Sequence, residues 1–142
     1  NPLACSAGLA VLNELTQNGL IENAADKGAK LSARLVSLMD RYPFIGDVRG
    51  KGLLLAFELV ADRQSMEPLP AGVAAHTALV EEAYKRGLII YSRRTRGGTV
   101  GDHFMVCPPL IVTDDQLDEI MQLLVESLDA FASTSGLPVN GS

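Results

Sequence analysis

The spacing of apolar residues predicts four helices along the chain. An uncharged run from Pro2 to Leu12, preceded by Asn1 as an N-cap, opens the first helix, and Gly19 lies just past its end. In the next two segments, apolar residues recur every three or four positions until a proline or a glycine interrupts them. A capping box at residues 113–116 opens the last helix. The predicted helices cover residues 2–17, 22–41 and 73–86, and a final stretch that ends before a frayed, flexible tail at 133–142.

The stretches between these helices change to glycine-punctuated apolar runs, which are typical of β-strands. Strands are predicted over 45–49, 53–60, 88–91 and 103–107, with loops over 62–72 and 92–102. Gly50 and Gly52 predict a positive-φ turn, and Pro108-Pro109 predicts the end of sheet pairing. Two N-terminal helices followed by a small, mainly antiparallel sheet with helices on one face make an α+β fold.

The composition is that of a globular protein. It argues against a nucleic-acid-binding, membrane-spanning or secreted protein. The chain has 142 residues, of which 47% are hydrophobic, and a net charge of −5, whereas a nucleic-acid-binding face needs a dominant positive charge. No apolar run reaches membrane-spanning length, and no signal-peptide pattern opens the chain. Cys5 and Cys107 match no metal or disulfide framework, so a reduced, cytoplasmic protein is expected, with Cys107 as a small buried hydrophobe.

The first predicted helix lacks a charged residue over its first three turns and is apolar on every side. Such a helix is normally covered on every side. The rest of the chain supplies few segments that could cover it, so we expect this chain to be a fragment of a larger protein.

Few residues follow the pattern of a catalytic site. The sequence contains no dinucleotide-binding or phosphate-binding glycine loop and no nucleophile elbow. His76 is expected on an exposed helix surface. Asp102-His103 is expected to be a structural turn, because neighbours on a strand point to opposite faces and would not form an acid–base dyad. The four lysines fall on polar helix faces or in a tight turn, so none is expected to be the desolvated amine of a Schiff base.

The most informative polar feature is the glycine-bearing loop that contains Arg93, Arg94 and Arg96. A guanidinium grips a carboxylate through two parallel hydrogen bonds, each of which contributes about 1.5–3 kcal/mol when shielded from water. Three arginines within four residues therefore suggest a mobile anion clamp. Composition alone favours a solvated loop that carries surface charge.

Five short motifs follow one another along the chain. They are Asn-Pro-Leu-Ala-Cys-Ser-Ala at 1–7, Gly-Asp-Val-Arg-Gly-Lys-Gly-Leu at 46–53 with Phe-Glu-Leu-Val at 57–60, Arg-Gly-Leu-Ile at 86–89, Gly-Asp-His at 101–103, and Pro-Pro-Leu-Ile-Val-Thr at 108–113. In this order and spacing they resemble the C-terminal part of class III pyridoxal-phosphate-dependent aminotransferases, and the resemblance extends to Phe131.

The resemblance implies a fold-type-I enzyme, in which residues 1–19 lead out of a missing large cofactor domain and residues 20–132 form the small C-terminal domain. It implies that pyridoxal phosphate forms a Schiff base with a lysine upstream of this chain. It further implies a homodimer that moves an amino group from an amine or ω-amino acid to an oxo acid such as pyruvate. None of the implied cofactor-binding residues falls within the chain, so the chain alone is expected to be inactive.

One departure from the family pattern bears on the substrate. Members that act on ornithine, acetylornithine or 4-aminobutyrate resemble one another in the strand before the Pro-Pro-Leu motif. They have there an arginine that binds a substrate carboxylate, and this chain has Met105 at that position. A thioether cannot pair with a carboxylate. The pattern is therefore closest to the amine and β-alanine:pyruvate transaminases, in which a loop arginine just upstream swings in for acids. This implies a substrate-binding role for Arg93, Arg94 or Arg96, with none singled out.

Two further expectations concern scaffold and function. Arg49 and Glu58 are expected to form an ion pair across adjacent strands, in a structural role. Two alternative functions stay open: a mutase or decarboxylase on the same scaffold, and a free-standing α+β module that binds a small anion or a partner protein. Net amine transfer to pyruvate tests the first alternative, and a first helix covered within the chain would favour the second.

Overall fold

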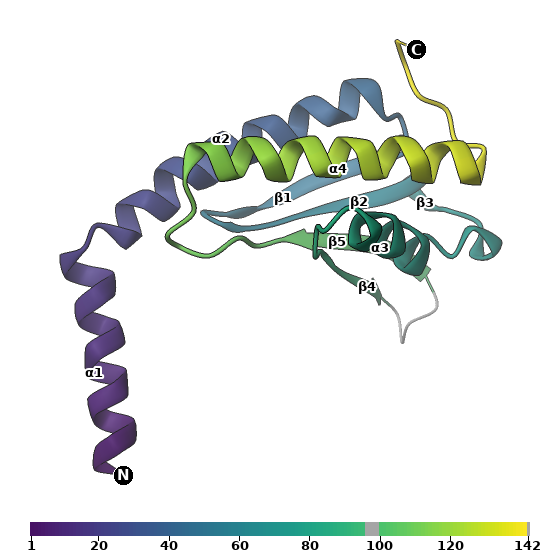
Figure 1. Ribbon diagram of the computed structural model, residues 1–142. Coiled ribbons are helices and arrows are strands. Elements are labelled where there is room, and N and C mark those ends of the chain that lie inside the picture. Colours follow the sequence, from purple (N-terminus) through teal and green to yellow (C-terminus); the bar gives the residue numbers. More distant parts are fainter. Residues whose placement is uncertain (96–99, 142) are drawn as a thin grey trace.

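The computed structural model describes residues 1–95 and 100–141 (Figure 1). The chain forms, in order, α1 (Pro2–Gln17), α2 (Leu20–Arg41), β1 (Ile45–Lys51), β2 (Leu54–Asp62), β3 (Glu67–Pro68), a 3₁₀ turn η1 (Ala71–Val73), α3 (Ala75–Lys85), β4 (Tyr91–Thr95), β5 (Val100–Val106) and α4 (Asp114–Ser135). None of the described helices is both long and apolar enough to span a bilayer.

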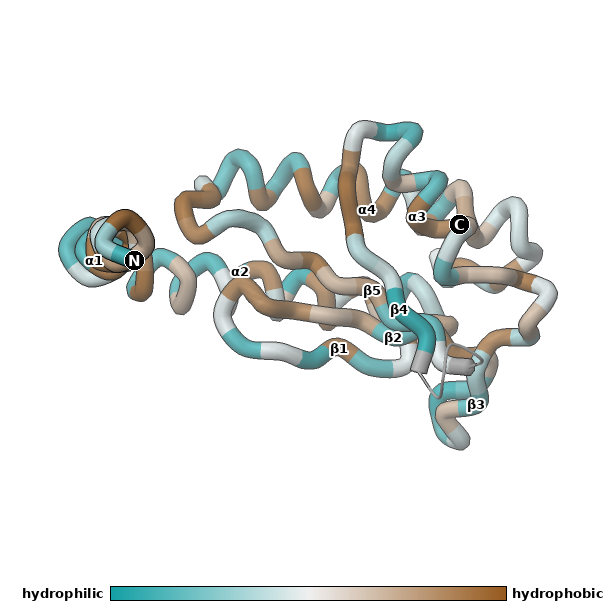
Figure 2. Tube along the Cα trace, turned by 90° about the horizontal axis from the view of Figure 1, so that it is seen from below, coloured by the Kyte–Doolittle hydropathy of each residue, from teal (hydrophilic) through white to brown (hydrophobic). Residues whose placement is uncertain are grey.

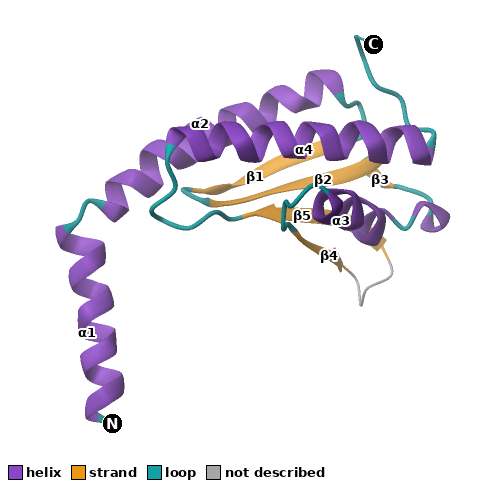
Figure 3. Cartoon of the chain, viewed as in Figure 1, coloured by secondary structure: helices purple, strands orange, loops and turns teal. Residues whose placement is uncertain are grey.

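The strands form one antiparallel sheet in the order β1-β2-β5-β4, and the short β3 pairs with the end of β2. Helices α2 and α4 lie side by side across the same face of this sheet (Figures 1 and 3). Helix α3 packs on α4 and on β4 and β5. The predicted α+β fold, a small antiparallel sheet with helices on one face, is confirmed.

The hydrophobic core lies between the sheet and these helices. Alternate residues of β2 and β5 face it, and Phe57 and Phe104 stack there with ring centroids 5.2 Å apart. Each of these rings is at most 1% exposed, and full burial of such a side chain contributes about 1.5–3 kcal/mol. The helices contribute the leucines of their apolar stripes, which include Leu31, Leu35, Leu38, Leu117, Leu124 and Leu128.

Helix α1 projects away from the rest of the chain (Figures 1 and 2). It begins as predicted, because the Leu3 amide donates to Asn1 Oδ1 at 3.0 Å, and Gly19 beyond its end has φ +67°. None of its residues is buried, and Leu3 is 77% exposed. The chain therefore leaves uncovered the apolar helix that the sequence pattern predicted to need a partner.

The sheet edge departs from the predicted pattern. A strand was expected over 88–91 and a loop over 92–102, but β4 begins at Tyr91 and β5 already at Val100. Leu88 and Ile90, which are 9% and 5% exposed, pack in the hydrophobic core but do not pair in the sheet. Their apolar pattern therefore reflects core packing and not a strand. Arg93 and Arg94 consequently lie on a strand, and the predicted mobile loop at these two positions is wrong.

The predicted flexible tail at 133–142 is also different in the structure. Helix α4 continues to Ser135 and ends at Gly136, which has φ +67°. Beyond it, the Asn140 amide donates to the Arg41 carbonyl at 2.8 Å, and Leu137 and Val139 pack against the core. These contacts with the end of α2 are long-range, so the Ser- and Gly-rich composition gave no sign of them.

The turn between β1 and β2 packs closely on α2. Gly50 and Gly52 have φ +141° and +56°, which confirms the predicted positive-φ turn. Gly28 on α2 faces this turn, and a Cβ built on it would lie 2.3 Å from the Gly52 carbonyl carbon. A methyl group at position 28 therefore forces the helix away from the sheet.

We expect Gly28→Ala to lower the free energy of unfolding by about 3 kcal/mol, because the clash is with backbone that cannot rotate away. Gly8→Ala is the matched control, since nothing lies within 4 Å of its Cβ position. Alanine in that exposed helix should be neutral or stabilise the protein by about 0.5–1 kcal/mol. Urea unfolding of both variants measures this, and equal effects would contradict the packing argument.

The start of α4 is held to α2 by charge. The predicted capping box is present, with Thr113 accepting from the Gln116 amide. Asp114 Oδ2 lies 2.6 Å from Lys27 Nζ, and its Oδ1 lies 3.0 Å from Lys30 Nζ. Hydrogen bonds from Lys27 and then Lys30 lower the pKa of the Asp114 carboxyl below its usual 3.8.

Asp114→Asn should therefore destabilise the protein at neutral pH and make little difference in acid. A carboxyl whose pKa is lowered by folding stabilises the protein above about pH 3.8, its ordinary value, and this stabilisation is lost as the pH falls through the lowered folded-state pKa. The measurement is the unfolding midpoint between pH 7 and pH 2, with Asp115→Asn as the control in the same helical turn. A difference between wild type and Asp114→Asn that did not change with pH would contradict it.

Candidate functional site

The side of the sheet opposite the helices carries a group of polar and apolar side chains that the core does not use. Successive residues of a strand point to opposite faces of the sheet. Phe57 and Phe104 point to the face that the helices cover, so the residues directly before and after each of them point to the uncovered face. Two cross-strand rows define this uncovered sheet face. They are Arg49–Ala56–Met105–Tyr91 and Asp47–Glu58–His103–Arg93.

The structure places Arg94 on the covered side of the sheet. Its Nε donates to Asp102 Oδ1 at 2.9 Å, and Asp102 is only 3% exposed. His76 Nδ1 of α3 lies 3.4 Å from the same carboxylate oxygen, and the Ser92 hydroxyl donates to the His76 carbonyl. Arg94 is therefore committed to a buried cluster that joins α3 to β4 and β5.

Two expectations about these residues are wrong. His76 is not a simple surface residue, because its Nδ1 is covered and its side chain is 30% exposed. Asp102 and His103 do not form a turn but lie within β5. They do point to opposite faces, as expected, so they form no dyad. The long-range pairing of Asp102 with Arg94 and its proximity to His76 left no signal in the local pattern.

Arg93 lies on the uncovered sheet face. Its guanidinium carbon is 5.8 Å from the ring centroid of Tyr91, and the side chain makes no ion pair with any residue in 1–95 or 100–141. His103 is directly opposite on β5, and Met105 is two residues further along the same strand. The remaining candidate, Arg96, lies outside the described residues.

Arg49 on the same face is already neutralised. Its Nη1 lies 2.7 Å from Asp47 Oδ2 and 2.8 Å from Glu58 Oε2. The hydrogen bond to Asp47, followed by that to Glu58, raises the pKa of Arg49. The predicted Arg49–Glu58 ion pair is confirmed, and with two carboxylates around it Arg49 has little capacity left for a third.

The described lysines do not form a Schiff-base site, and the described residues form no metal centre. Lys27, Lys30 and Lys85 are ion-paired, and Lys51 is exposed in the β1–β2 turn. Cys107 is exposed, which corrects the expectation of a buried residue. Within the described part of the chain, no three His, Cys, Asp or Glu side chains gather where they could share a metal ion.

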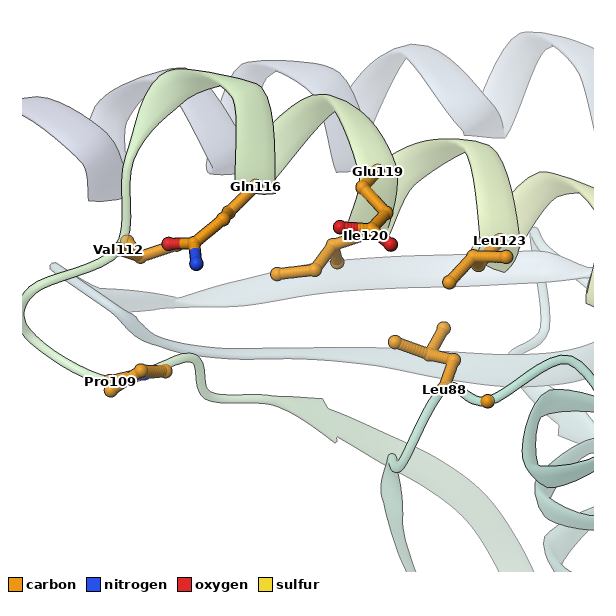
Figure 4. A pocket seen from close by; sticks show the side chains of 8 residues that line it. Leu88, Pro109, Val112, Gln116, Glu119, Ile120 and Leu123 are labelled. Carbon is orange, nitrogen blue, oxygen red and sulfur yellow. The ribbon is translucent and has the colours of Figure 1, made fainter.

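A hollow on the other side of the molecule does not contribute to this face. It lies between α4 and the segment around Leu88, has a volume of about 260 Å³, and is lined by apolar side chains together with Gln116 and Glu119 (Figure 4). None of the arginines that the structure describes lines it. Because it carries Arg93, which has no counter-ion among residues 1–95 and 100–141, the uncovered sheet face is the candidate site.

Comparison with known proteins decides the family. The family model Aminotransferase class-III matches residues 1–128. The chain belongs to the class-III aminotransferases. It is 36% identical over 116 residues to the taurine–pyruvate aminotransferase of Bilophila wadsworthia, with 82% of this chain and 25% of that protein covered.

Solved aminotransferase structures show the same fold. A PMP-bound aminotransferase from Vibrio fluvialis matches with a TM-score of 0.82 and 28% identity, over 93% of this chain and 27% of that one. An ω-aminotransferase from Paracoccus denitrificans matches with a TM-score of 0.82 and 28% identity, over 94% and 28%. The chain thus spans less than a third of the length of these relatives.

In this class-III aminotransferase chain, the buried Asp102 and Arg94 should be strongly coupled, because removing either one leaves the other charge unpaired. Asp102→Asn leaves the Arg94 charge without its partner, and breaking a buried pair costs about 3–5 kcal/mol. The double variant Asp102→Asn/Arg94→Gln should recover much of this loss, because no unpaired charge remains. Urea unfolding of both single variants and the double variant gives the coupling energy, and additive losses would contradict a paired role.

Proposed function

We propose that the full-length protein is a pyridoxal-phosphate-dependent aminotransferase that moves an amino group from an amine or ω-amino acid to an oxo acid such as pyruvate. Membership of the class-III aminotransferases supports the reaction type. The relatives named taurine–pyruvate aminotransferase and ω-aminotransferase support this substrate class. Mutase or decarboxylase chemistry on the same scaffold is separated from it by an assay of net amine transfer to pyruvate.

The cofactor is supported by the PMP-bound relative. When bound, pyridoxal phosphate supplies the electron sink that makes the amino-bearing carbon acidic. The residues of this chain do not fit its covalent attachment, because three lysines are ion-paired and Lys51 is exposed in a turn. We therefore assign the attachment lysine to the upstream part of the full-length protein and expect residues 1–142 alone to be inactive.

The contribution of this chain is a wall of the substrate site. Residues 20–132 form a small C-terminal domain, and α1 leads out of a large cofactor domain that covers its exposed leucines. The uncovered α1 supports this arrangement over a free-standing module. A homodimer in the cytoplasm is the assembly and location that we propose for the full-length protein.

Arg93 is the residue that we assign to the substrate carboxylate. The observation that carries this choice is its position: Arg93 shares the uncovered sheet face with Met105, whereas Arg94 is tied to Asp102 beneath the sheet. Met105 leaves its own position without a charge, and Arg49 is neutralised by two carboxylates. Arg93 is therefore the described arginine on this face that is free to bind an anion.

The test compares two amino donors of similar length, β-alanine and propylamine, in the full-length protein. Each donor is added without an acceptor, and the loss of the yellow cofactor absorbance gives its rate. Arg93→Ala should slow β-alanine by about 10–100-fold, the loss of one or two hydrogen bonds from a charged donor, and leave propylamine almost unchanged.

Lys51→Ala removes a cation at the end of β1, which is the opposite edge strand of the sheet from β4. It is the matched control, with no change expected for either donor. Equal slowing of both donors by Arg93→Ala would contradict the assignment of Arg93. A full-length protein that binds no pyridoxal phosphate would contradict the proposed function itself.

A further inference from the structure

His103 lies at the centre of the uncovered sheet face. It is directly opposite Glu58 on β2 and directly opposite Arg93 on β4. Side chains at directly opposed positions have Cβ atoms about 4.5–5.5 Å apart. A ligand held by Arg93 is therefore within reach of the imidazole.

The surroundings of Nδ1 decide which nitrogen of a neutral His103 carries the proton. Its Nδ1 is covered and has no hydrogen-bond partner in the described part of the chain. A neutral imidazole carries one donor and one acceptor nitrogen. A proton on Nδ1 would be a buried donor without an acceptor, which is unfavourable. The proton therefore belongs on Nε2, and Nε2–H is the group that His103 can offer to a ligand.

The charges around His103 favour an anion on its Arg93 side. On the other side, the carboxylate of Glu58 is bonded to Arg49, which also binds Asp47. In the row Asp47–Glu58–His103–Arg93, the two carboxylates at one end are thus already paired with Arg49. Arg93 at the other end has no counter-ion among the described residues.

The neighbouring row supplies an apolar surface for the remainder of a ligand. Tyr91, 55% exposed, and Met105 pair directly with each other across β4 and β5, beside the Arg93–His103 pair. A short carbon chain can lie along them while its charged end meets Arg93 and His103. This combination of two donors and an apolar strip fits a carboxylate on a small organic molecule.

We propose that His103 and Arg93 together form a carboxylate site, in which His103 is a specificity-determining residue that donates through Nε2 to the carboxylate that Arg93 binds. The proposal rests on the proposed function and refines it. The site favours amino donors that carry a carboxylate remote from the amino group over simple amines.

The experiment uses the full-length enzyme with its cofactor and the same two donors, β-alanine and propylamine. His103→Leu removes the donor and keeps an apolar side chain of similar size. It should raise the concentration of β-alanine needed for half-maximal bleaching of the cofactor by about tenfold, as expected for one hydrogen bond to a charged group, and leave propylamine unchanged. His103→Gln places an amide N–H close to the position of Nε2 and should restore most of the loss.

A double variant tests whether the two residues share one ligand. If Arg93 and His103 bind the same carboxylate, the loss of His103 should matter little once Arg93 is gone. The preference for β-alanine over propylamine should then be almost the same in Arg93→Ala/His103→Leu as in Arg93→Ala alone. Butyrate, added as an inhibitor against propylamine, gives the same comparison without turnover of the acid, and His103→Leu should weaken its inhibition by a similar factor.

The outcomes separate this inference from the proposed function. If Arg93→Ala changes the preference between donors but His103→Leu does not, or if His103→Leu affects both donors alike, the role of His103 is refuted while the proposed function stands. Failure of His103→Gln to restore butyrate inhibition also refutes it. If the wild-type protein transfers no amino group from either donor to pyruvate, the proposed function fails.

Discussion

The structure depends on a sheet whose strands present alternate side chains to opposite sides, while helices cover only one of those sides. On the covered side, Phe57 and Phe104 stack and the leucines of α2 and α4 close over them. On the other side, the same strands present Glu58, His103 and Arg93. One backbone arrangement thus builds the core and the candidate site at once, and a one-residue slip of register would exchange the two.

The buried Asp102–Arg94 pair strengthens this constraint at the sheet edge, where β4 has a strand on one side only. With Arg94 bound under the sheet and His76 of α3 beside the same carboxylate, β4 is held in one register against β5. Arg93, the next residue, is consequently directed to the uncovered face. Two adjacent arginines of identical chemistry thereby have different surroundings: Arg94 is paired with a buried carboxylate, whereas Arg93 has no counter-ion among the described residues.

Helix α1 shows a constraint of another kind. Its cap and its end lie within the chain, yet its apolar side chains contact almost nothing there. The chain spans less than a third of the length of the relatives it matches. Within residues 1–95 and 100–141, no contact buries any residue of α1.

Local signals in the sequence determined much of the fold. Helix caps and tight turns are formed by contacts between residues close in sequence, so they can be predicted without tertiary contacts. Examples are the Asn1 cap, Gly19, the Gly50–Gly52 turn and the capping box at Thr113. The motif order determined the family. Strand β4 was misplaced because Leu88 and Ile90, buried outside the sheet, look like strand residues. Only the tertiary structure decided that Arg94 meets Asp102, that His76 joins them and that Arg93 shares a face with His103. These pairings depend on the register between strands and on the packing of α3, which are set by the whole core and not by neighbouring residues.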